Sequence, residues 1–378
     1  MIVEKLANDI DIKKALIELG VDGGGVNILA SKSKSYIIHI KNLHVGGANI
    51  LKQDALSIGA DLAVPKGTVV AKDKYVDAIL IATQKHLRIL SKKELAQPFG
   101  LKELAHELKK IAKIEKPKQT EIMGVINAND DSFYSGSRFK DSHALNTIIK
   151  MIEDGADIID IGGVSSRPNA PIVSAKEEFT RVKPILQAIK NAKLYEKIRF
   201  SIDSYEPMVI SEALSSGFSI VNDITGLQNS EVCKLCSTHN ATAVIMHMQG
   251  TPQTMQNSPK YNDIINDVYK FFKFRIDRAE SFGVKDIVLD VGIGFGKSLD
   301  DNIKLIKNLE NFLTLNKKLL IGASRKSMID KIFASKTEDR LAGTLAIHLK
   351  AIRNGASIIR VHDVYEHAQA IKVTQALN

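Results

Sequence analysis

The sequence is poor in the residues that mark several classes of protein. Tryptophan is absent, and aromatic residues make up only 6% of the 378 positions. Base-stacking nucleic-acid surfaces depend on aromatic side chains, so we expect no nucleic-acid partner. No stretch approaches the roughly 20 apolar residues of a membrane-spanning helix, and the first residues lack the apolar core of a secretory signal. We therefore expect no membrane segment.

Cysteine is almost as scarce. Cys233 and Cys236 are the two cysteines, which is too few for a disulfide framework. Their C-x-x-C spacing, with His239 nearby, raises the alternative of a zinc or redox site, but a structural zinc site needs four ligands and no second pair exists. We favour two residues one turn apart on a short surface helix, and the cytoplasm as the compartment.

The net charge is +9, from 52 basic and 43 acidic residues. The excess lies mainly in residues 1–117, which hold 19 Lys and Arg against 13 Asp and Glu. These cations are scattered rather than gathered in a block. The pattern favours solvated lysines over a nucleic-acid patch.

Two regions differ in pattern, and Pro117 within KIEKPKQ is the predicted boundary between them. Residues 1–117 indicate a small α/β module with a helix near 3–19, a turn at Gly23–Gly25, strands near 36–40 and 78–83, and helices near 48–58 and 100–113. No P-loop or Rossmann pattern follows the glycines. The sequence assigns this region no function.

Residues 118–378 alternate short apolar runs with amphipathic segments. Such runs are typical of parallel strands covered on both faces. The predicted strands are 121–126, 157–161, 198–202, 219–223, 242–246, 286–290, 319–323 and 357–361. The predicted helices are 142–154, 174–192, 206–216, 229–239, 261–282, 300–314, 339–354 and 363–376. Expected helix caps are Asp141, Ser174, Asn229 and Asp300. Eight units favour an α/β fold of the (β/α)8 TIM barrel type over an open doubly wound sheet.

Polar residues follow the carboxyl ends of all eight predicted strands, where the chemistry of such barrels lies. Cations there suit a phosphate, pyrophosphate or carboxylate, and carboxylates with an amide suit a flat heterocycle rich in N–H donors. The loop GIGFGKS is one residue too short between its first and last glycine for a P-loop. We predict a flexible loop there, with Phe295 placed to pack on a ring and Met246 lining the pocket floor.

These loops resemble one family. The stretches MGVINANDDSF, IIDIGGVSSRP, SIDSYEP, VNDITGL, MHMQGTPQTM, LDVGIGFGKSLDDN, GASRKSMI and IIRVHDV are similar, in order, to the signature loops of dihydropteroate synthases. The resemblance covers residues 121 to about 376. It implies a transferase of folate biosynthesis in which p-aminobenzoate displaces pyrophosphate from 6-hydroxymethyl-7,8-dihydropterin pyrophosphate, giving 7,8-dihydropteroate. It also implies a cytoplasmic homodimer.

The resemblance assigns roles to residues of this chain. The pterin would be held by Asp203, Asn222, Met246, Asp290, Lys326 and Arg360. Of these, the catalytic residues would be Asp203, Lys326 and Arg360. Asn127 would bind Mg²⁺, and the pyrophosphate would lie among Asn127, Arg360 and His362. The p-aminobenzoate pocket, where sulfonamides compete, would be formed by Ser166, Arg167, Pro168, Phe295 and Ser327.

Some positions depart from the family pattern. Asn129 and Asp130 stand where Thr-Pro is usual, Val164 where an acidic residue is common, and Ser166 where Thr is usual. These departures bear on p-aminobenzoate affinity and sulfonamide sensitivity. They leave a catalytically silent pterin-binding paralogue as an alternative. A corrinoid-linked pterin methyltransferase is another, which the cations of Ser-Arg-Lys-Ser and Arg-Val-His disfavour.

Overall fold

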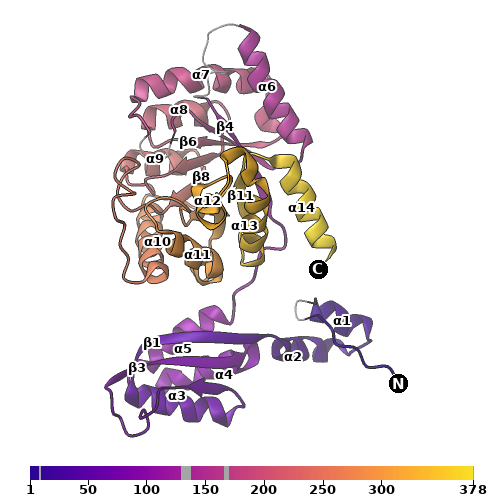
Figure 1. The fold of residues 1–378 in the computed structure, drawn as a ribbon, viewed down its shortest axis with the longest axis vertical. Helices are drawn as coiled ribbons and strands as arrows, with labels where there is room; N and C mark the ends of the chain where they lie inside the picture. The colour runs from indigo at the N-terminus through magenta and orange to yellow at the C-terminus, as the bar shows by residue number, and fades with distance from the viewer. Residues whose placement is uncertain (8–9, 129–137, 166–169, 378) are drawn as a thin grey trace. The chain divides into compact units, whose positions relative to one another are not determined.

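The computed structural model describes residues 1–7, 10–128, 138–165 and 170–377, with the backbone alone for 138–143. It divides into two compact units, Met1–Glu115 and Lys116–Leu377 (Figure 1). The division lies beside Pro117 in the charged segment KIEKPKQ. Among the described residues, no helix has both the length and the apolar character that a membrane span would need.

The first unit is built on a three-stranded antiparallel sheet in the order β1 (Ser35–His44), β3 (Tyr75–Thr83), β2 (Asp61–Ala63). Residues of β3 alternate between exposed and buried, which is the period-2 pattern of a strand with one covered face. Its buried side chains share a core with leucines from α3 (Val45–Ser57), α4 (Gln84–Lys93) and α5 (Leu101–Ile111).

Two predictions for this unit were wrong. The first helix is shorter than expected, because α1 spans Ile12–Glu18. Gly23–Gly25 form the first turn of α2 (Gly23–Ser33) rather than a loop turn. The reason is local: the Asp22 carboxylate accepts a hydrogen bond from the backbone N–H of Gly24 at 2.9 Å and so caps the helix. Helices α2 and α4 and strand β2 were not predicted.

The second unit is a closed barrel of eight parallel strands in the order β10-β11-β4-β5-β6-β7-β8-β9. The strands are β4 (Glu121–Asn127), β5 (Ile158–Gly162), β6 (Arg199–Asp203), β7 (Ile220–Asp223), β8 (Thr242–Met246), β9 (Ile287–Asp290), β10 (Lys318–Ile321) and β11 (Ile358–Val361). Closure confirms the predicted (β/α)8 barrel and excludes the open doubly wound sheet.

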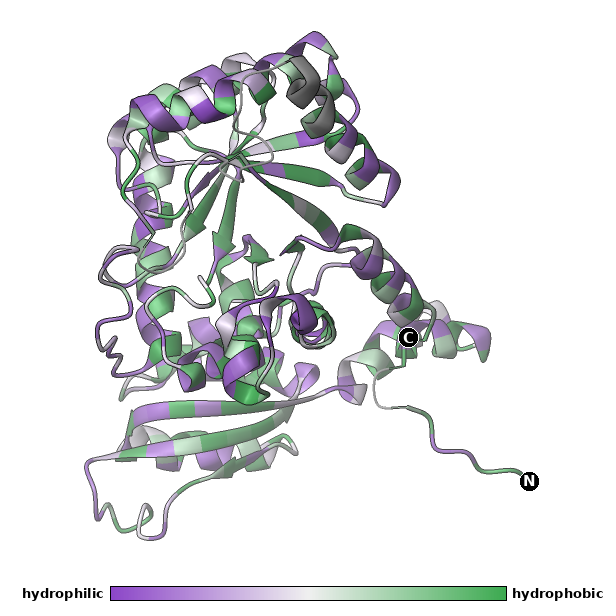
Figure 2. Ribbon diagram, turned by 45° about the horizontal axis from the view of Figure 1, so that its top comes forward, coloured by the Kyte–Doolittle hydropathy of each residue, from purple (hydrophilic) through white to green (hydrophobic). Residues whose placement is uncertain are grey.

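Helices surround the barrel (Figures 1 and 2). They are α6 (Arg138–Glu153), α7 (Ala175–Asn191), α8 (Pro207–Ser215), α9 (Ser230–Thr238), α10 (Ile264–Ser281), α11 (Leu299–Lys307), α12 (Ser327–Ile332), α13 (Leu341–Arg353) and α14 (Val364–Ala376). Short 3₁₀ segments lie at Glu94–Ala96, Leu194–Glu196, Leu309–Leu315 and Thr337–Arg340. Only α12 in this set had no counterpart in the sequence prediction.

Two of the four predicted helix caps are confirmed. Ser174 and Asn229 each accept a hydrogen bond from the first turn of the helix that follows. Asp141 instead falls within α6. Asp300 falls within α11, where Ser298 is the cap and forms a reciprocal capping box with the third residue of the helix. The serine two residues earlier was the better signal.

Inside the barrel, inward-facing side chains form an apolar layer that fills the lower lumen. Its members are Met123, Ile158, Ile220, Val244, Val288, Leu320 and Ile358, each at most 4% exposed. Intervening residues such as Ile159, Val221 and Leu289 face outward and pack beneath the helices. The strands are accordingly coloured mainly as hydrophobic in Figure 2. The layer closes the lumen from below, so a ligand can enter only from the other end.

Candidate active site

A polar layer lies directly above this apolar layer. Side chains two positions apart on a strand share a face, so the next inward residues are Asp160, Asn222, Met246, Asp290 and Arg360. Strand register places Asp203 beside Asn222, and Met246 beside Asp290. Residues far apart in the sequence are thus brought together at the carboxyl ends of the strands, as predicted from the sequence.

Arg360 connects two carboxylates across the lumen. Its Nε donates to Asp160 Oδ2 at 2.6 Å, and its Nη2 donates to Asp203 Oδ2 at 2.7 Å. Asn222 Nδ2 donates to the same oxygen of Asp160 at 3.2 Å. Burial disfavours the charge on Arg360, but Asp160 and Asp203 raise its pKa above the ordinary value. The guanidinium therefore stays charged and holds this part of the site together.

The charge of Asp203 is incompletely compensated by Arg360. Burial raises the pKa of Asp203 to about 7, because the effect of Arg360 is opposed by Asp160 and Glu178. One guanidinium shared between two carboxylates cannot neutralise both. A proton on Asp203 is consequently exchanged near neutral pH.

Asp290 and Lys326 form the opposite side of the site. Asp290 is buried and accepts a hydrogen bond from the N–H of Gly292 at 2.8 Å. Burial raises the pKa of Asp290, and Lys326 opposes the rise. Lys326 Nζ donates to the carbonyl of Ile293 and lies 4.5 Å from the ring centroid of Phe295. Burial lowers the pKa of Lys326 to about 8, against the opposing effect of Asp290.

Lys297 holds the glycine-rich loop beside Asp290. It is 3% exposed and donates to the carbonyls of His247 at 3.0 Å, Gly292 at 2.9 Å and Phe295 at 2.8 Å. Gly292 has φ +65°, and a Cβ there would lie 2.1 Å from the His247 carbonyl oxygen, so only glycine fits. The loop predicted to be flexible is therefore tied to the end of β8.

The loops after β10 and β11 are joined by an ion pair. Arg325 donates to both carboxylate oxygens of Asp363, at 2.6 and 3.0 Å. Asp363 occupies the N-cap position of α14, but its side chain makes no capping bond because both of its oxygens accept from Arg325. Arg325 is committed to this pair rather than to the substrate. His362 is exposed, and its Nδ1 lies 2.9 Å from Ser324 Oγ.

A buried chain of hydrogen bonds joins the same two loops from below. The N–H of Ala323 donates to His348 Nε2 at 3.0 Å, His348 Nδ1 lies 2.9 Å from His367 Nε2, and His367 Nδ1 lies 2.5 Å from the Asp363 carbonyl. Because Ala323 must donate, each imidazole carries its proton on Nδ1. Burial lowers the pKa of both histidines, so the chain is neutral.

The structure describes some of the remaining predicted residues and not others. Asn127 is half-buried at the end of β4, Phe295 is half-buried in the glycine-rich loop, and Ser327 is exposed at the start of α12. Ser166, Arg167 and Pro168, predicted for the p-aminobenzoate pocket, lie outside the described residues, as do the departures at Asn129 and Asp130. Val164 is described and half-buried.

Asp160 and Lys297 were missed by sequence reasoning. Asp160 was counted only as part of the strand DIIDI, although a carboxylate inside a buried run requires a partner. Lys297 was not considered because it belongs to GIGFGKS, the loop rejected as a P-loop. Asp160 lies two residues after Ile158 of the apolar layer, as Asp290 lies two residues after Val288. This shared spacing could have identified Asp160 from the sequence.

Metal ligands are few in the described part of the chain, where no group of three or more His, Cys, Asp or Glu side chains could hold an ion. Cys233 and Cys236 are free, buried thiols on α9. Burial raises the pKa of both, that of Cys236 to about 12. A thiol held in its protonated form is a poor nucleophile and metal ligand, so these cysteines act as packing residues.

Comparison with known proteins agrees with this geometry. The family model described as pterin binding enzyme matches residues 123–362. The chain belongs to the dihydropteroate synthase family of pterin-binding enzymes. This family match covers the polar layer, ends at His362 and includes no residue of the N-terminal unit.

Individual relatives differ in how much of the chain they match: one aligns with both units, and others with about the length of the barrel alone. A bifunctional dihydropteroate synthase/dihydropteroate reductase of Helicobacter pylori is 42% identical over 377 residues, covering 100% of this chain and 99% of that protein. A Clostridium difficile dihydropteroate synthase structure, determined in the presence of pteroic acid, is 38% identical, with TM-score 0.63, and covers 70% of this chain and 98% of that one. A Thermus thermophilus dihydropteroate synthase structure in complex with 4-aminobenzoate is 35% identical, with TM-score 0.62, and covers 69% and 95%.

Proposed function

We propose that the chain is a dihydropteroate synthase. In this reaction the amine of p-aminobenzoate displaces pyrophosphate from the methylene carbon of 6-hydroxymethyl-7,8-dihydropterin pyrophosphate. The C–N bond forms as the C–O bond breaks, giving 7,8-dihydropteroate. The observation that carries the proposal is the polar layer of Asp203, Asn222, Asp290 and Arg360, closed below by apolar side chains, in a member of this family.

The pterin ring explains why the site is built of acceptors. Its pyrimidine edge presents several N–H donors, and Asp290 and Asn222 offer a carboxylate and an amide oxygen to receive them. Positive charge develops on the pterin as pyrophosphate leaves, so an ionised Asp203 favours the transition state. Because the pterin itself makes the methylene electrophilic, no protein nucleophile is needed.

The leaving group requires positive charge, and we assign Arg360 and His362, with Asn127, to that side of the site. Lys326 stays on the pterin side, beside Asp290. The pairing of Arg360 with two carboxylates leaves it charged but partly compensated. The enzyme's further contribution is to hold the amine and the methylene carbon in line, which converts a bimolecular encounter into a local step. Phe295 and Ser327 are assigned to the p-aminobenzoate side, together with Ser166, Arg167 and Pro168.

Mg²⁺ is the proposed cofactor, and Asn127 its proposed protein ligand. The half-buried carboxamide of Asn127, at the end of β4, supplies one oxygen. Mg²⁺ commonly takes one or two protein ligands and completes its shell with water and substrate phosphates. The donor set in the described residues fits that arrangement rather than an all-protein cage. When bound, the ion would neutralise pyrophosphate charge.

Pyrophosphate release on mixing both substrates with Mg²⁺ tests the synthase. We expect release that requires p-aminobenzoate and is accompanied by 7,8-dihydropteroate. A folded protein that binds the pterin and releases nothing would favour the silent paralogue. Methyl transfer from a methylated pterin, without pyrophosphate chemistry, would favour the corrinoid-linked methyltransferase.

Two further proposals concern the state of the protein. We propose a cytoplasmic location, supported by the free thiols of Cys233 and Cys236. We propose a homodimer, which follows from the resemblance to the family. Light scattering after size exclusion measures the assembly, and a monomeric mass at working concentration would reject the dimer.

A second activity is favoured by one observation. The Helicobacter pylori relative aligns with the full chain, residues 1–115 included, and its name adds a dihydropteroate reductase. We propose that the N-terminal unit supports the same reduction here. Dihydropteroate would take up a hydride from a reduced nicotinamide or flavin, which is thereby oxidised, and a proton from solvent, giving tetrahydropteroate.

A truncation separates the two activities. The solved Clostridium difficile relative consists almost entirely of the matching barrel, so residues 116–378 are expected to fold alone. The fragment should keep synthase activity and lose donor oxidation that depends on dihydropteroate. Equal reduction by the fragment, or none by the full chain with nicotinamide or flavin donors, would reject the second activity and leave the first intact.

A further inference from the structure

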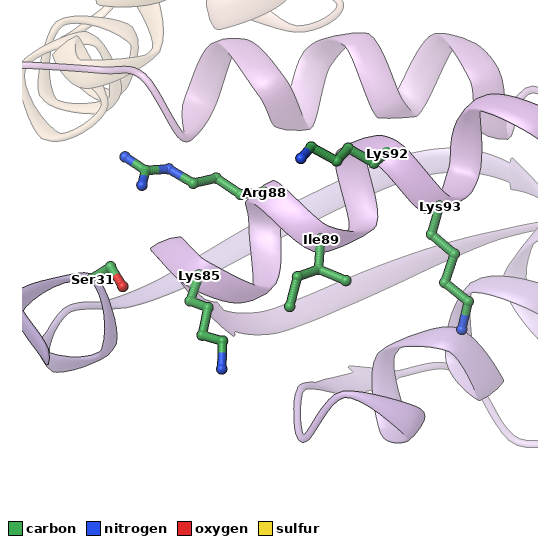
Figure 3. A pocket seen from close by; sticks show the side chains of 6 residues that line it. All are labelled: Ser31, Lys85, Arg88, Ile89, Lys92 and Lys93. Carbon is green, nitrogen blue, oxygen red and sulfur yellow. The ribbon is translucent and has the colours of Figure 1, made fainter. Parts of the chain in front are cut away.

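A pocket of about 470 Å³ is lined entirely by residues of the N-terminal unit. It is formed by Ser31 of α2 and by one face of α4. The lining residues are Ser31, Lys85, Arg88, Ile89, Lys92 and Lys93. Figure 3 shows the cationic side chains extending from α4, with Ile89 among them.

Helix α4 has two chemically different faces. Leu87, Leu90 and Ser91 are buried against the core of the unit. Lys85, Arg88 and Lys92 are exposed on the pocket face, at the i, i+3 and i+7 spacing of one helical stripe. The cationic stripe is therefore a fixed feature of the fold, because the packing of the leucines sets its direction.

The three cations of this stripe have no acidic partner. Within the described residues, Lys85, Arg88 and Lys92 form no ion pair within 4.0 Å, whereas the neighbouring Lys93 pairs with Asp54 at 2.8 Å. Like charges three or four residues apart on a helix destabilise it by roughly 0.2–0.5 kcal/mol per pair. An anion in the pocket would remove this repulsion.

The surrounding sequence is also free of carboxylates. No Asp or Glu occurs in residues 23–53 or 78–93, which include the whole of α2 and α4. The chain elsewhere holds 43 acidic residues, so two acid-free stretches meeting at one pocket are a specific feature. No carboxylate lines the pocket itself, and Asp54, beside the lining residue Lys93, is already neutralised by that lysine.

We propose that this pocket binds a small organic ligand carrying phosphate groups, of about the size of a nucleotide. Arg88 offers the planar, multiply donating group that matches phosphate oxygens, and the lysines add charge. The volume falls within the range of small-molecule sites. Ile89 and the aliphatic stems of the lysines supply apolar surface for the organic part. No aromatic side chain lines the pocket, which disfavours stacked nucleic acid.

The binding site does not depend on either activity proposed above. Calorimetric titration of the full chain with ATP, NADPH and inorganic pyrophosphate would test it, since these compounds share phosphate chemistry and differ in the organic part. We expect saturable one-to-one binding of at least one nucleotide. The double variant Arg88→Gln/Lys92→Gln should weaken it at least tenfold while synthase activity stays unchanged.

Two controls define the outcome. Lys66→Gln/Lys72→Gln removes the same charge from exposed loop positions of the same unit outside the pocket, and Lys326→Ala alters the barrel site; both should keep nucleotide binding. Equal loss in the Lys66/Lys72 control would reduce the effect to bulk charge and overturn the proposal. So would unchanged binding in the Arg88/Lys92 variant, no binding of any of the three compounds, or tighter binding of an RNA oligonucleotide than of any nucleotide.

Discussion

Arg360 and Asp203 are joined across the barrel lumen by a hydrogen bond of 2.7 Å between Nη2 and Oδ2. They stand on β11 and β6, which are three positions apart in the closed order of eight strands. The pair sets the position and the charge of the cation nearest the pterin side. It also places a carboxylate of raised pKa where positive charge would develop on the substrate.

Asp203→Asn tests the electrostatic role of this carboxylate. We expect turnover to fall by about 100-fold, the scale on which a positioned electrostatic group contributes, with a smaller change in pterin affinity. Steady-state rates and direct pterin titration separate the two effects. Normal turnover together with normal pterin binding would show that the Asp203 charge plays no part.

Lys326→Ala removes the cation next to Asp290. Asp290 would then lose its largest compensating charge and keep the hydrogen bond from the Gly292 N–H, and the pterin pyrophosphate would lose a charged contact. We expect affinity for this substrate to fall by about 10- to 100-fold, since a charged hydrogen bond is worth roughly 1.5–3 kcal/mol. Lys304→Ala, at an exposed position of α11, is the control. Near-normal affinity in Lys326→Ala would contradict the assigned site.

The pH dependence follows from the same two groups. Asp203, with its pKa raised to about 7, is protonated below that pH, and Lys326, with its pKa lowered to about 8, is neutral above that pH. An ionised Asp203 and a protonated Lys326 therefore coexist mainly between these two pKa values. The pH profile of kcat/KM should be a narrow bell-shaped curve. Lys326→Arg should move the alkaline limb upward, because arginine keeps its charge. An unmoved alkaline limb would exclude Lys326 as its source.

Lys297→Met tests the support of the glycine-rich loop. The change leaves the carbonyls of His247, Gly292 and Phe295 without the donor that now serves all three. We expect a loss of about 3 kcal/mol in the free energy of unfolding, on the scale of lost charged hydrogen bonds, together with weaker pterin binding. Urea unfolding measures the first effect. A loss below about 0.5 kcal/mol would mean that the loop does not depend on Lys297.

The barrel was predictable because its signals are local. Each strand is a short apolar run, each is followed by an amphipathic segment, and the polar residues fall at one end of the strands. The positions of Asp203, Asn222, Asp290 and Arg360 therefore followed from strand ends alone. Cap positions were harder to predict: Ser298, two residues before the expected cap Asp300, takes that role.

What the sequence did not reveal depends on partners distant along the chain. Arg325 meets Asp363 because β10 and β11 become neighbours, and Arg360 meets Asp160 because closure of the barrel brings β11 and β5 to the same lumen. The histidine chain through His348 arises in the same way. In the N-terminal unit, Gly23–Gly25 alone indicate a turn, but Asp22 caps them and they begin helix α2. The cationic face of α4 became a pocket only through α2.

A crystal structure with bound 6-hydroxymethyl-7,8-dihydropterin pyrophosphate tests the central claim most directly. The account predicts the bicyclic ring within hydrogen-bonding distance of Asn222 and Asp290, above the apolar layer that includes Val288, and the diphosphate toward the cations at the mouth. A ring bound in any other cavity, with Asp203 and Asp290 untouched, would contradict the account.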